Sequence, residues 1–344
     1  MNLYTSAGWV NAAVWFTDPA PFVVALGGRG TGKTYGALDY IVERDIRFLY
    51  MRRTQVQIDL VKQAAFNPFR PVNTNRGSDI VSAPLGKIAA GFFHGHEEDN
   101  KIILDSDAVG VGVSLSTVSS VRGIDASDKT ILLFDEFIAE KQDRKAIKDE
   151  GLAFLNAYET FNRNRELLGD PPLKCILLAN TNRLQSDILF SLGALEAAEK
   201  MVRQGKAHTV TAGGLVSLYN YVDSPISREK AATVLYQLRA NEEFTNMALD
   251  NQFSAENYSE VVQRPLQEYK PIASINGVTL WRHKSERRYY VTDGEVAPVK
   301  YGMSQVDIAA FCRRFDDVEF LRIHRKLDFS SAVVKIKWCQ VWGV

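Results

Sequence analysis

A glycine-rich segment at residues 27–34 has the residue types and spacing needed to hold phosphate. It reads Gly-Gly-Arg-Gly-Thr-Gly-Lys-Thr and fits the P-loop pattern Gly-x-x-x-x-Gly-Lys-Thr. Glycines tolerate positive φ angles, so the backbone N–H groups of such a loop can turn toward phosphate oxygens. We expect the loop residues to surround the phosphates of ATP, Lys33 to contact the β- and γ-phosphates, and the Thr34 hydroxyl to bind Mg²⁺. The expected nucleotide-binding positions here are Gly27, Gly28, Arg29, Gly30, Thr31, Gly32, Lys33 and Thr34.

A pair of acidic residues, Asp135 and Glu136, directly follows the apolar run 130–134. This arrangement is typical of a Walker B element. We expect Asp135 to hold Mg²⁺ through its water shell, and Glu136 to orient and polarise the attacking water as general base. An Asp-Glu pair after a strand also occurs in purely structural roles, so the prediction depends on the P-loop upstream.

The next apolar run, 174–179, ends in three polar residues, Asn180, Thr181 and Asn182. The amide of Asn180 can hydrogen-bond both the γ-phosphate and the attacking water, and Thr181 or Asn182 can fill the same role. A helix N-cap is the alternative of equal weight.

Four arginines are candidates for the cation that hydrolysis needs at its developing negative charge: Arg29, Arg122, Arg163 and Arg165. Arg29 would act within its own subunit. Ring motors usually take this cation from the neighbouring subunit, and we predict that role for Arg163 or Arg165. A plain solvated helix end is the alternative for these two.

The elements around these residues alternate between strand and helix. An apolar strand at 22–26 precedes the P-loop and a helix follows it, which makes a chance glycine-rich turn a poor alternative. The pattern predicts an α/β fold with a mainly parallel sheet. Expected strands are 22–26, 46–51, 130–134, 174–179, 208–211 and 215–222; expected helices are 34–43, 56–65, 147–165 and 186–204; a hairpin-rich insertion is expected over 86–115.

An aromatic leader, residues 1–20, precedes the first strong strand and contains Tyr4, Trp9, Trp15 and Phe16. Packing of these rings on the sheet is the favoured interpretation, because scattered aromatic residues usually lie in a core. Covering a nucleotide base is the alternative.

The composition limits the classes of function. Among 344 residues, 41 Lys plus Arg balance 41 Asp plus Glu, so any nucleic-acid surface must be local. Three widely spaced cysteines suit reduced thiols in a cytosol-like compartment. The five histidines lack metal-ligand spacing, His94-Gly-His96 being the nearest approach, and no apolar stretch is long enough to span a membrane. We expect a soluble protein without a zinc site.

Three parts of the chain are expected. A P-loop ATPase domain occupies 1–222, a helical linker or lid occupies 223–262 with a helix at 227–238, and a small α+β domain occupies 263–344. The last part shows short strand patterns at 272–275, 277–281 and 288–292, with Asn276-Gly277 as a hairpin turn, and ends in the β-branched and aromatic run 333–341.

Several short sequence strings, taken in combination, resemble one family, the DNA-packaging ATPases of small protein-primed podoviruses of the phi-29 type. The Asp-Glu-Phe-Ile and Asn-Arg-Glu strings are much more specific than the P-loop alone, and the length suits a member from a lactococcal phage. The matching strings are the P-loop, Arg52-Arg53, 133–138 with Glu140-Lys141 behind it, 162–166, 178–180 and 249–253.

This resemblance implies an ATP-driven motor that translocates double-stranded genomic DNA through the portal into a procapsid. It implies a P-loop NTPase fold of the ASCE, RecA/terminase-like kind, with ATP and Mg²⁺ as cofactors. It also implies a homo-oligomeric ring, a pentamer by likeness to the family, in the host cytoplasm and transiently at the portal vertex. The implied partners are DNA, the portal or connector protein and a prohead RNA.

By position in the family strings, Arg163 matches a trans-acting arginine finger and Lys141 falls in a loop that faces the DNA pore. Arg122 matches a basic residue that reaches across the subunit interface, although the family is expected to have lysine there. The C-terminal part in this family resembles a degenerate RNase H-type nuclease.

Residues 270–344 fit a nuclease that has lost its active site, because the first strand, 272–275, lacks the Asp at which a two-metal nuclease begins. Five aspartates remain in this part: Asp293, Asp307, Asp316, Asp317 and Asp328. From 281 to 344 there are 12 Lys plus Arg and 8 Asp plus Glu, an excess of four that suits RNA or phosphate binding and equally a solvated basic surface.

Two other functions compete with the packaging motor. A RecA-like cellular helicase or translocase predicts strand separation, and a large terminase with an active nuclease predicts Mn²⁺-dependent DNA cleavage by 263–344. No further helicase motif supports the first, and the absent strand aspartate weighs against the second.

Overall fold

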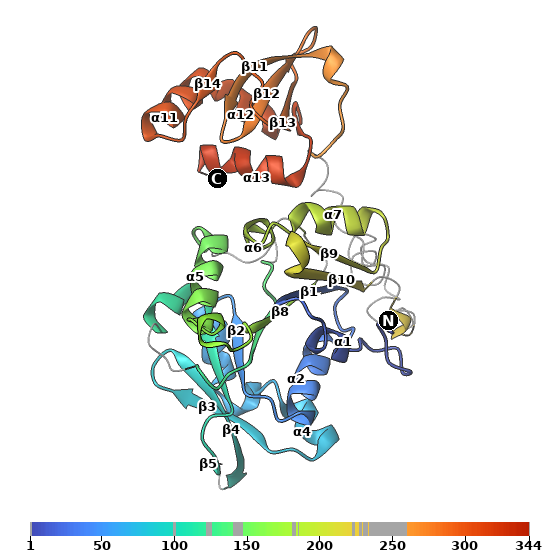
Figure 1. The fold of residues 1–344 in the computed structure, drawn as a ribbon, viewed down its shortest axis with the longest axis vertical. Coiled ribbons are helices and arrows are strands. Elements are labelled where there is room, and N and C mark those ends of the chain that lie inside the picture. The colour runs from blue at the N-terminus through green and yellow to red at the C-terminus, as the bar shows by residue number, and fades with distance from the viewer. Residues whose placement is uncertain are drawn as a thin grey trace. The chain divides into compact units, whose positions relative to one another are not determined.

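The chain divides into two units, Met1–Gln252 and Phe253–Val344, each with its own sheet and core (Figure 1). The computed structural model describes residues 2–98, 101–121, 126–139, 147–180, 184, 186–221, 224–226, 229, 233 and 260–343. The predicted boundaries at 222 and 262 stay predictions, because most of the expected linker and its helix at 227–238 lie outside the described residues.

The sheet of the first unit has ten strands in the order β3-β4-β6-β2-β7-β8-β1-β10-β9, with β5 paired to β4. The six strands from β6 to β10 are mutually parallel, and the antiparallel pairs lie at the two sides. The strands are β1 Phe22–Gly27, β2 Phe48–Arg52, β3 Ile80–Leu85, β4 Ala89–Glu98, β5 Lys101–Leu104, β6 Gly110–Ser114, β7 Ile131–Asp135, β8 Lys174–Asn180, β9 His208–Thr211 and β10 Val216–Tyr221. The mainly parallel α/β sheet expected from the sequence is confirmed.

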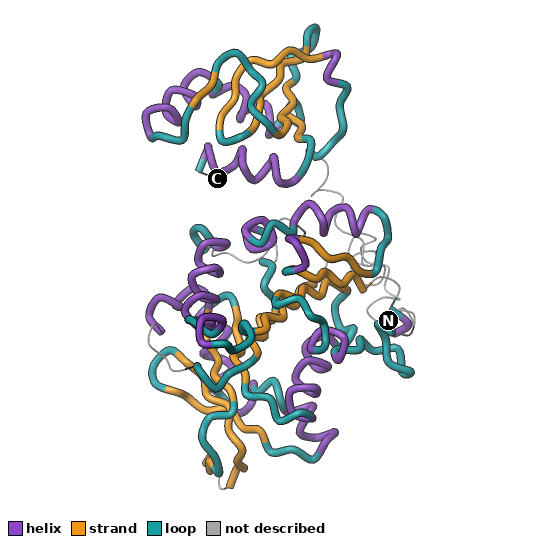
Figure 2. The backbone as a smooth tube through the Cα atoms, viewed as in Figure 1, coloured by secondary structure: helices purple, strands orange, loops and turns teal. Residues whose placement is uncertain are grey.

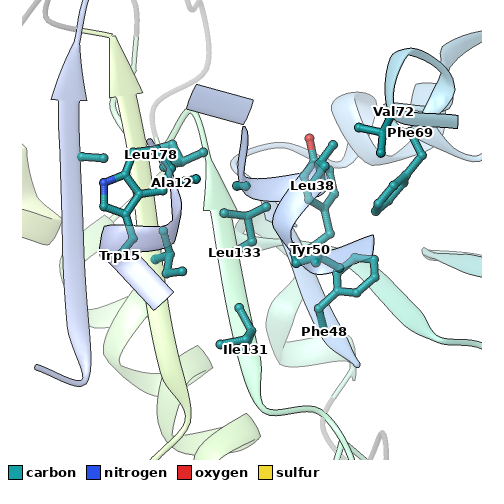
Figure 3. Close-up of a cluster of buried hydrophobic side chains, with 14 of the residues drawn as sticks. Ala12, Trp15, Leu38, Phe48, Tyr50, Phe69, Val72, Ile131, Leu133 and Leu178 are labelled. Atoms are coloured by element: carbon teal, nitrogen blue, oxygen red, sulfur yellow. The ribbon is translucent and has the colours of Figure 1, made fainter. Parts of the chain in front are cut away.

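Helices cover both faces of this sheet, which explains why its central strands are apolar along their whole length. Leu38 of α2 lies in one cluster with Leu133 and Leu178 of the strands (Figure 3), whereas Phe154 of α5 stacks on Phe134 on the other face. The helices are α1 Ala13–Phe16, α2 Lys33–Glu43, α3 Gln55–Val61, α4 Arg70–Arg76, α5 Glu150–Asn162, α6 Asp187–Ser191 and α7 Leu195–Arg203.

Three helical segments differ from the expected ones. The single helix expected at 186–204 is two helices, α6 and α7, separated at Gly193, whose φ of 63° is easy only for glycine. The segment 56–65 is α3 followed by a short 3-10 turn, and α5 begins at Glu150 instead of residue 147. Helix type was predictable here, and helix length was not.

In its described residues, from 260 to 343, the second unit contains a five-stranded sheet in the order β14-β11-β12-β13-β15, together with the α-helices α11, α12 and α13 (Figure 2). Its core gathers around Trp338 and Phe311. The elements are β11 Tyr269–Ile275, β12 Val278–His283, β13 Tyr289–Asp293, β14 Lys300–Tyr301, β15 Leu327–Phe329, α11 Gln305–Arg314, α12 Asp316–Ile323 and α13 Ala332–Trp342.

The β-branched and aromatic run near the C-terminus forms a helix, α13, although its composition is typical of a strand. Ser331 caps the helix by accepting a hydrogen bond from the Val334 N–H, and Gly343 follows its end with a φ of 68°. Val334, Trp338 and Val341 recur at helical spacing and are buried, so packing of one face overrides the strand preference.

Candidate active site

The P-loop connects β1 to α2, as its sequence predicts. Gly30 and Gly32 have φ angles of 64° and 90°, which side-chain-bearing residues rarely adopt. Gly27 has a different reason to be glycine: a Cβ there would lie 2.9 Å from the Cβ of Tyr221 on the adjacent strand β10. The loop backbone is therefore shaped by its glycines and by the neighbouring strand.

Lys33, the first residue of α2, is buried and directs its ammonium into the loop. Its Nζ donates to the backbone carbonyls of Gly27 at 2.8 Å and Gly28 at 2.7 Å, and to Asn180 Oδ1 at 3.3 Å. Asn180 is brought there by the sheet, because it pairs with Gly27 in the register of β1 and β8. Two of the predicted site residues, far apart in sequence, thus meet at one ammonium group.

Thr34 and Asp135 are joined directly, since the Thr34 hydroxyl donates to Asp135 Oδ1 at 2.9 Å. The Asp135 side chain is 4% exposed and ends the buried strand β7. Mg²⁺ bound to a nucleotide needs only one or two protein oxygens beside phosphates and waters, so this pair fits the ion. Thr34 and Asp135 would hold Mg²⁺ here, and the ion would neutralise charge on the phosphates.

Arg52, at the end of β2, contacts both acidic residues and was not predicted as a site residue. Its Nη1 lies 2.7 Å from Asp135 Oδ2, and its Nη2 lies 2.5 Å from Glu136 Oε2. The Tyr50 hydroxyl also donates to Asp135 Oδ2, at 3.0 Å. The signal in the sequence was the position of Arg52 at the carboxyl end of a predicted strand, and the structure adds that this strand pairs with β7.

The electrostatics of this cluster favour a charged guanidinium. Burial alone would lower the pKa of Arg52, but Tyr50 and the carboxylates of Asp135 and Glu136 raise it by more, so the pKa moves up. Burial, followed by the Asp135 charge, raises the pKa of Tyr50 well above its ordinary value. Tyr50 therefore stays a neutral hydrogen-bond donor, and Arg52 stays a cation.

Glu136 turns out of the strand with a φ of 55°, and its side chain is 44% exposed. Together with the P-loop it borders a cavity of about 620 Å³, large enough for the phosphates and sugar of a nucleotide. The lining residues are Arg29, Gly30, Gly32, Lys33, Thr34, Tyr35, Gln57, Glu136, Ile138 and Asn180.

A second cavity of about 620 Å³ adjoins the first and shares Gly32 and Tyr35 with it. Trp9 and Val10 of the aromatic leader form part of its wall, and a Cβ on Gly32 would lie 3.1 Å from the Trp9 ring. Trp15 instead is fully buried and donates its indole N–H to the Tyr221 hydroxyl at 2.7 Å. The leader thus packs on the sheet through Trp15 and borders the nucleotide site through Trp9.

A turn at residues 5–9 holds this part of the leader. The Gly8 N–H donates to the Thr5 carbonyl at 2.9 Å, and the Thr5 N–H donates to the Trp9 carbonyl at 2.8 Å. The next residue, Val10, donates its N–H to the Thr31 carbonyl of the P-loop at 3.1 Å. On its other side, the Gly8 carbonyl accepts from the Ser224 hydroxyl at 3.4 Å.

Of the candidate arginines, only Arg29 lines the cavity among the residues that the structure describes. Arg163 directly follows α5. Its neighbour Arg165 places this segment near the amino ends of the strands, because the Arg165 guanidinium donates to the carbonyls of Ser127, at 2.9 Å, and Lys129, just before β7. Asp135 lies at the other end of β7. Five strand residues, roughly 16 Å, separate the two edges, so Arg163 lies far from the cavity of its own chain.

Some predictions fall on residues without a described structure. Arg122, Lys141, Thr181 and Asn182 lie outside the described residues. The roles expected for them therefore stay predictions. Arg165 is described, and its contacts with the carbonyls before β7 give it a structural task.

The acidic residues of the second unit are spread out. Asp328 pairs with Arg264 at 2.8 Å and Arg288 at 3.2 Å, and Asp293 pairs with Lys337 at 2.6 Å. Within the described ranges, no three His, Cys, Asp or Glu side chains are placed to hold a metal ion. In the same ranges, no helix is long and apolar enough to cross a membrane.

Comparison with known proteins gives consistent matches. The Podovirus DNA encapsidation protein (Gp16) family matches residues 19–294. The DNA packaging protein of Bacillus phage PZA is 26% identical over 277 residues, covering 77% of this chain and 73% of the relative; that of Bacillus phage phi29 is 26% identical over 264 residues, covering 74% and 69%. The solved bacteriophage Phi-29 viral genome packaging motor assembly contains a chain of the same fold, with a TM-score of 0.63, 18% identity and 99% of both chains covered.

Proposed function

This chain belongs to the Podovirus DNA encapsidation protein (Gp16) family, and we propose from that premise that it hydrolyses ATP to drive double-stranded viral DNA through a portal into a procapsid. The observation that carries the ATPase is the meeting of Lys33, Thr34, Asp135, Glu136 and Asn180 around one cavity. Helix α2 supplies Lys33 and Thr34, the end of strand β7 supplies Asp135 and Glu136, and the end of strand β8 supplies Asn180.

The nucleotide would lie across the two adjoining cavities. The loop N–H groups and Lys33 would hold the phosphates at the N-terminus of α2, where the helix dipole favours negative charge. The base would enter the neighbouring cavity beside Trp9 and Tyr35, whose rings suit stacking. The shared lining of Gly32 and Tyr35 supports a single ligand that spans both.

Hydrolysis would use Glu136 as general base and Asn180 as a hydrogen-bond partner of the γ-phosphate or the attacking water. The ion pair with Arg52 holds the Glu136 carboxylate and weakens it as a base, because a cation stabilises the deprotonated form. Arg52 is therefore a positioning residue, and Glu136 must leave it to accept a proton from water.

The family supports further proposals about assembly. We infer a homo-oligomeric ring, of five subunits by analogy with the family, that works at the portal vertex in the host cytoplasm and meets a prohead RNA. Arg163 would supply a cation to the next subunit, with Arg122 as a second basic residue at the same interface. Lys141 would contact DNA in the pore.

Two substitutions test the ATPase. Lys33→Ala should abolish both ATP binding and hydrolysis, because it removes the buried phosphate contact. Glu136→Gln should keep binding and lower the rate of hydrolysis by at least about a hundredfold, because an amide cannot accept the proton. Phosphate release and binding of a fluorescent ATP analogue with Mg²⁺ measure the two steps.

A matched control is Glu196→Gln, an exposed position on α7. It should leave binding and hydrolysis unchanged. Undiminished hydrolysis by Glu136→Gln would remove the proposed base, and undiminished binding by Lys33→Ala would remove the proposed phosphate site.

A further inference from the structure

Gln57, the third residue of helix α3, lines the nucleotide cavity and was not predicted as a site residue. It is half-buried and shares the cavity wall with Lys33, Glu136 and Asn180. The wall of the adjoining cavity, beside Trp9, does not include it. Its side chain therefore faces the end of the site where the phosphates of a nucleotide would lie, and not the end where the base would lie.

The cap of helix α3 occupies one end of the Gln57 amide. Gln57 Oε1 accepts from the Thr54 N–H at 3.0 Å and from the Thr54 hydroxyl at 3.2 Å. This is the capping box that a Thr-x-x-Gln sequence can form at the start of a helix. A backbone N–H can only donate, so the amide atom beside it is the oxygen, and Nε2 must point away from the cap.

The other end of the amide, Nε2, is a pure donor. In the described ranges of the chain it has no hydrogen-bond acceptor, so both of its hydrogens are available to a ligand. Such a group cannot take a proton from water and cannot replace Glu136 as a base. It suits an anionic oxygen, because hydrogen bonds to charged acceptors are roughly twice as strong as those to neutral ones. Phosphate oxygens are the anionic acceptors that a nucleotide brings into this cavity.

The order of the strands indicates which phosphate Gln57 can meet. Along the carboxyl edge the strands run β1, β8, β7, β2; the P-loop follows β1, whereas α3 begins shortly after β2. Neighbouring strands lie about 4.8 Å apart, so roughly 14 Å separates β1 from β2. Thr34, at the start of α2, already meets Asp135 of β7, so the phosphates lie between β1 and β7. The terminal phosphate is then the part of the nucleotide nearest to α3.

Helix α3 is held in place on two sides. Ile58 is fully buried in the core of the first unit. Gln55 Oε1 accepts from the hydroxyls of Thr117 at 2.7 Å and Ser114 at 3.1 Å, and its Nε2 donates to the Ile88 carbonyl at 2.8 Å. A side chain on a support fixed in this way loses little entropy when it binds a ligand.

We propose that Gln57 Nε2 donates a hydrogen bond to the γ-phosphate of the bound nucleotide and thereby makes the site prefer ATP to ADP. The proposal rests on the proposed function for the identity of the cavity. ADP lacks the acceptor, so only ATP gains the contact. Hydrolysis removes the acceptor, and the product is then held less tightly than the substrate.

Gln57→Glu removes the donor and keeps the cap. The glutamate can accept from Thr54 as the glutamine does, and Thr-x-x-Glu is itself a capping box. The variant should therefore fold, and its affinity for ATP should fall at least about tenfold more than its affinity for ADP. Competition of ADP and of a slowly hydrolysed ATP analogue against the fluorescent analogue, with Mg²⁺, measures the two dissociation constants.

Gln57→Met separates the lost donor from the added charge. Methionine has a similar length, donates no hydrogen bond and places no negative charge beside the phosphates. The ratio of the ADP to the ATP-analogue dissociation constant should still fall at least about tenfold, because a hydrogen bond to a charged acceptor is lost. The ratio should fall further in Gln57→Glu, where the carboxylate also repels the γ-phosphate.

The matched control is Gln63→Glu. Gln63 is exposed, lies two residues beyond the end of α3 and lines neither cavity. The same change of charge at this position should leave both dissociation constants as in the wild type.

Three results would overturn the proposal. An unchanged ratio in Gln57→Met, with an unchanged circular dichroism spectrum, would leave Gln57 with the capping role alone. A ratio that falls only in Gln57→Glu would assign the effect to the added charge. An equal loss of affinity for ATP and ADP would show that Gln57 does not distinguish the γ-phosphate. If Gln57→Met does not fold, wild-type binding of both nucleotides by Gln57→Glu overturns the proposal equally.

The Lys33→Ala variant separates this proposal from the proposed function. Binding that Lys33→Ala abolishes, with a ratio that the Gln57 variants leave unchanged, would overturn the γ-phosphate contact and leave the ATPase standing. Binding of both nucleotides that survives Lys33→Ala would remove the identity of the cavity, and both proposals with it.

Discussion

At the scale of single residues, the site is a set of charges that hold each other in place. Arg52 bridges Asp135 and Glu136, and Lys33 is held by loop carbonyls and Asn180. The cation of one element thus satisfies the acidic groups of another, which keeps buried charges paired. When a nucleotide binds, Lys33 must therefore exchange its contacts with the loop carbonyls and Asn180 for phosphate, and Glu136 must release Arg52.

Replacing Arg52 tests the value of this pairing. Arg52→Met should lower the free energy of unfolding by about 3 kcal/mol, because it leaves the buried Asp135 carboxylate without its cation. Arg47→Met is the matched control, since its pair with Asp128 is 47% and 42% exposed and should contribute less than about 1 kcal/mol. Urea unfolding measures both, and equal losses would contradict the prediction.

Asp18, just before β1, gives the protein a predictable response to acid. Burial would raise the pKa of Asp18, but hydrogen bonds donated by Tyr219 at 2.6 Å and Ser217 at 2.7 Å outweigh it, so the pKa falls below its ordinary 3.8. The folded state then binds this proton less tightly than the unfolded state. The carboxylate therefore stabilises the fold above pH 3.8, and this stabilisation is lost as the pH falls through the folded pKa.

The variant Asp18→Asn should reveal this dependence of stability on pH. It should lower the free energy of unfolding by about 2 kcal/mol at neutral pH and make little difference once wild-type Asp18 is itself protonated. Denaturant unfolding across the acid range measures the difference. A loss of constant size at every pH would assign Asp18 a role that does not depend on its charge.

At the scale of elements, parallel strands explain why distant residues converge. The carboxyl ends of β1, β2, β7 and β8 lie along one edge, which brings together the P-loop, Arg52, the acidic pair and Asn180. The other edge carries the loop of residues 163–172, between α5 and β8. Each strand thus separates two surfaces by its own length, and helix α5 returns the chain from one edge to the other.

Asn162 should be the residue that fastens the loop of residues 163–172 to α5. Asn162→Ala would leave the Leu173 N–H and the Glu166 carboxylate without this partner, at a cost of about 2 kcal/mol in the free energy of unfolding. Asn156→Ala, at an exposed position on the same helix, should cost less than about 0.5 kcal/mol. Thermal unfolding compares them, and equal melting temperatures would refute the fastening role.

The sequence was sufficient where one local pattern decides the outcome. Glycine spacing predicted the P-loop, and the apolar run before Asp135 predicted its place at a strand end. Arg52 was not predicted as a site residue, and a place for Trp9 beside the nucleotide was only the alternative prediction, because these contacts depend on the order of the strands and on the path of the leader. Helix α13 differs from its composition for a similar reason, since packing around Trp338 decides it.

At the scale of the whole molecule, two cores of different size share one chain. Ligand binding raises the free energy of unfolding of the unit that binds the ligand, by about 2.7 kcal/mol when the free ligand concentration is a hundred times Kd. We expect two thermal transitions, of which Mg²⁺ and an ATP analogue raise only one. Lys33→Ala should abolish that shift, and Phe329→Ala, a core change in the second unit, should lower only the other transition.

Calorimetry with and without nucleotide checks this prediction. A single transition that moves as a whole would show that the two cores unfold together. Shifts confined to one transition would assign the nucleotide site to the first unit, in agreement with the position of the P-loop.

The amino-terminal turn at residues 5–9 has a mechanical consequence. On one side Val10 is bonded to the P-loop carbonyl of Thr31, and on the other Gly8 meets Ser224, just after the last parallel strand, where the chain leaves the sheet. A Cβ on Gly8 would lie 2.9 Å from Pro225, so the turn has little slack on that side. We therefore expect the turn to couple the two segments mechanically. A displacement of the P-loop would be transmitted to the chain at Ser224, and a displacement of the chain there would be transmitted to the P-loop.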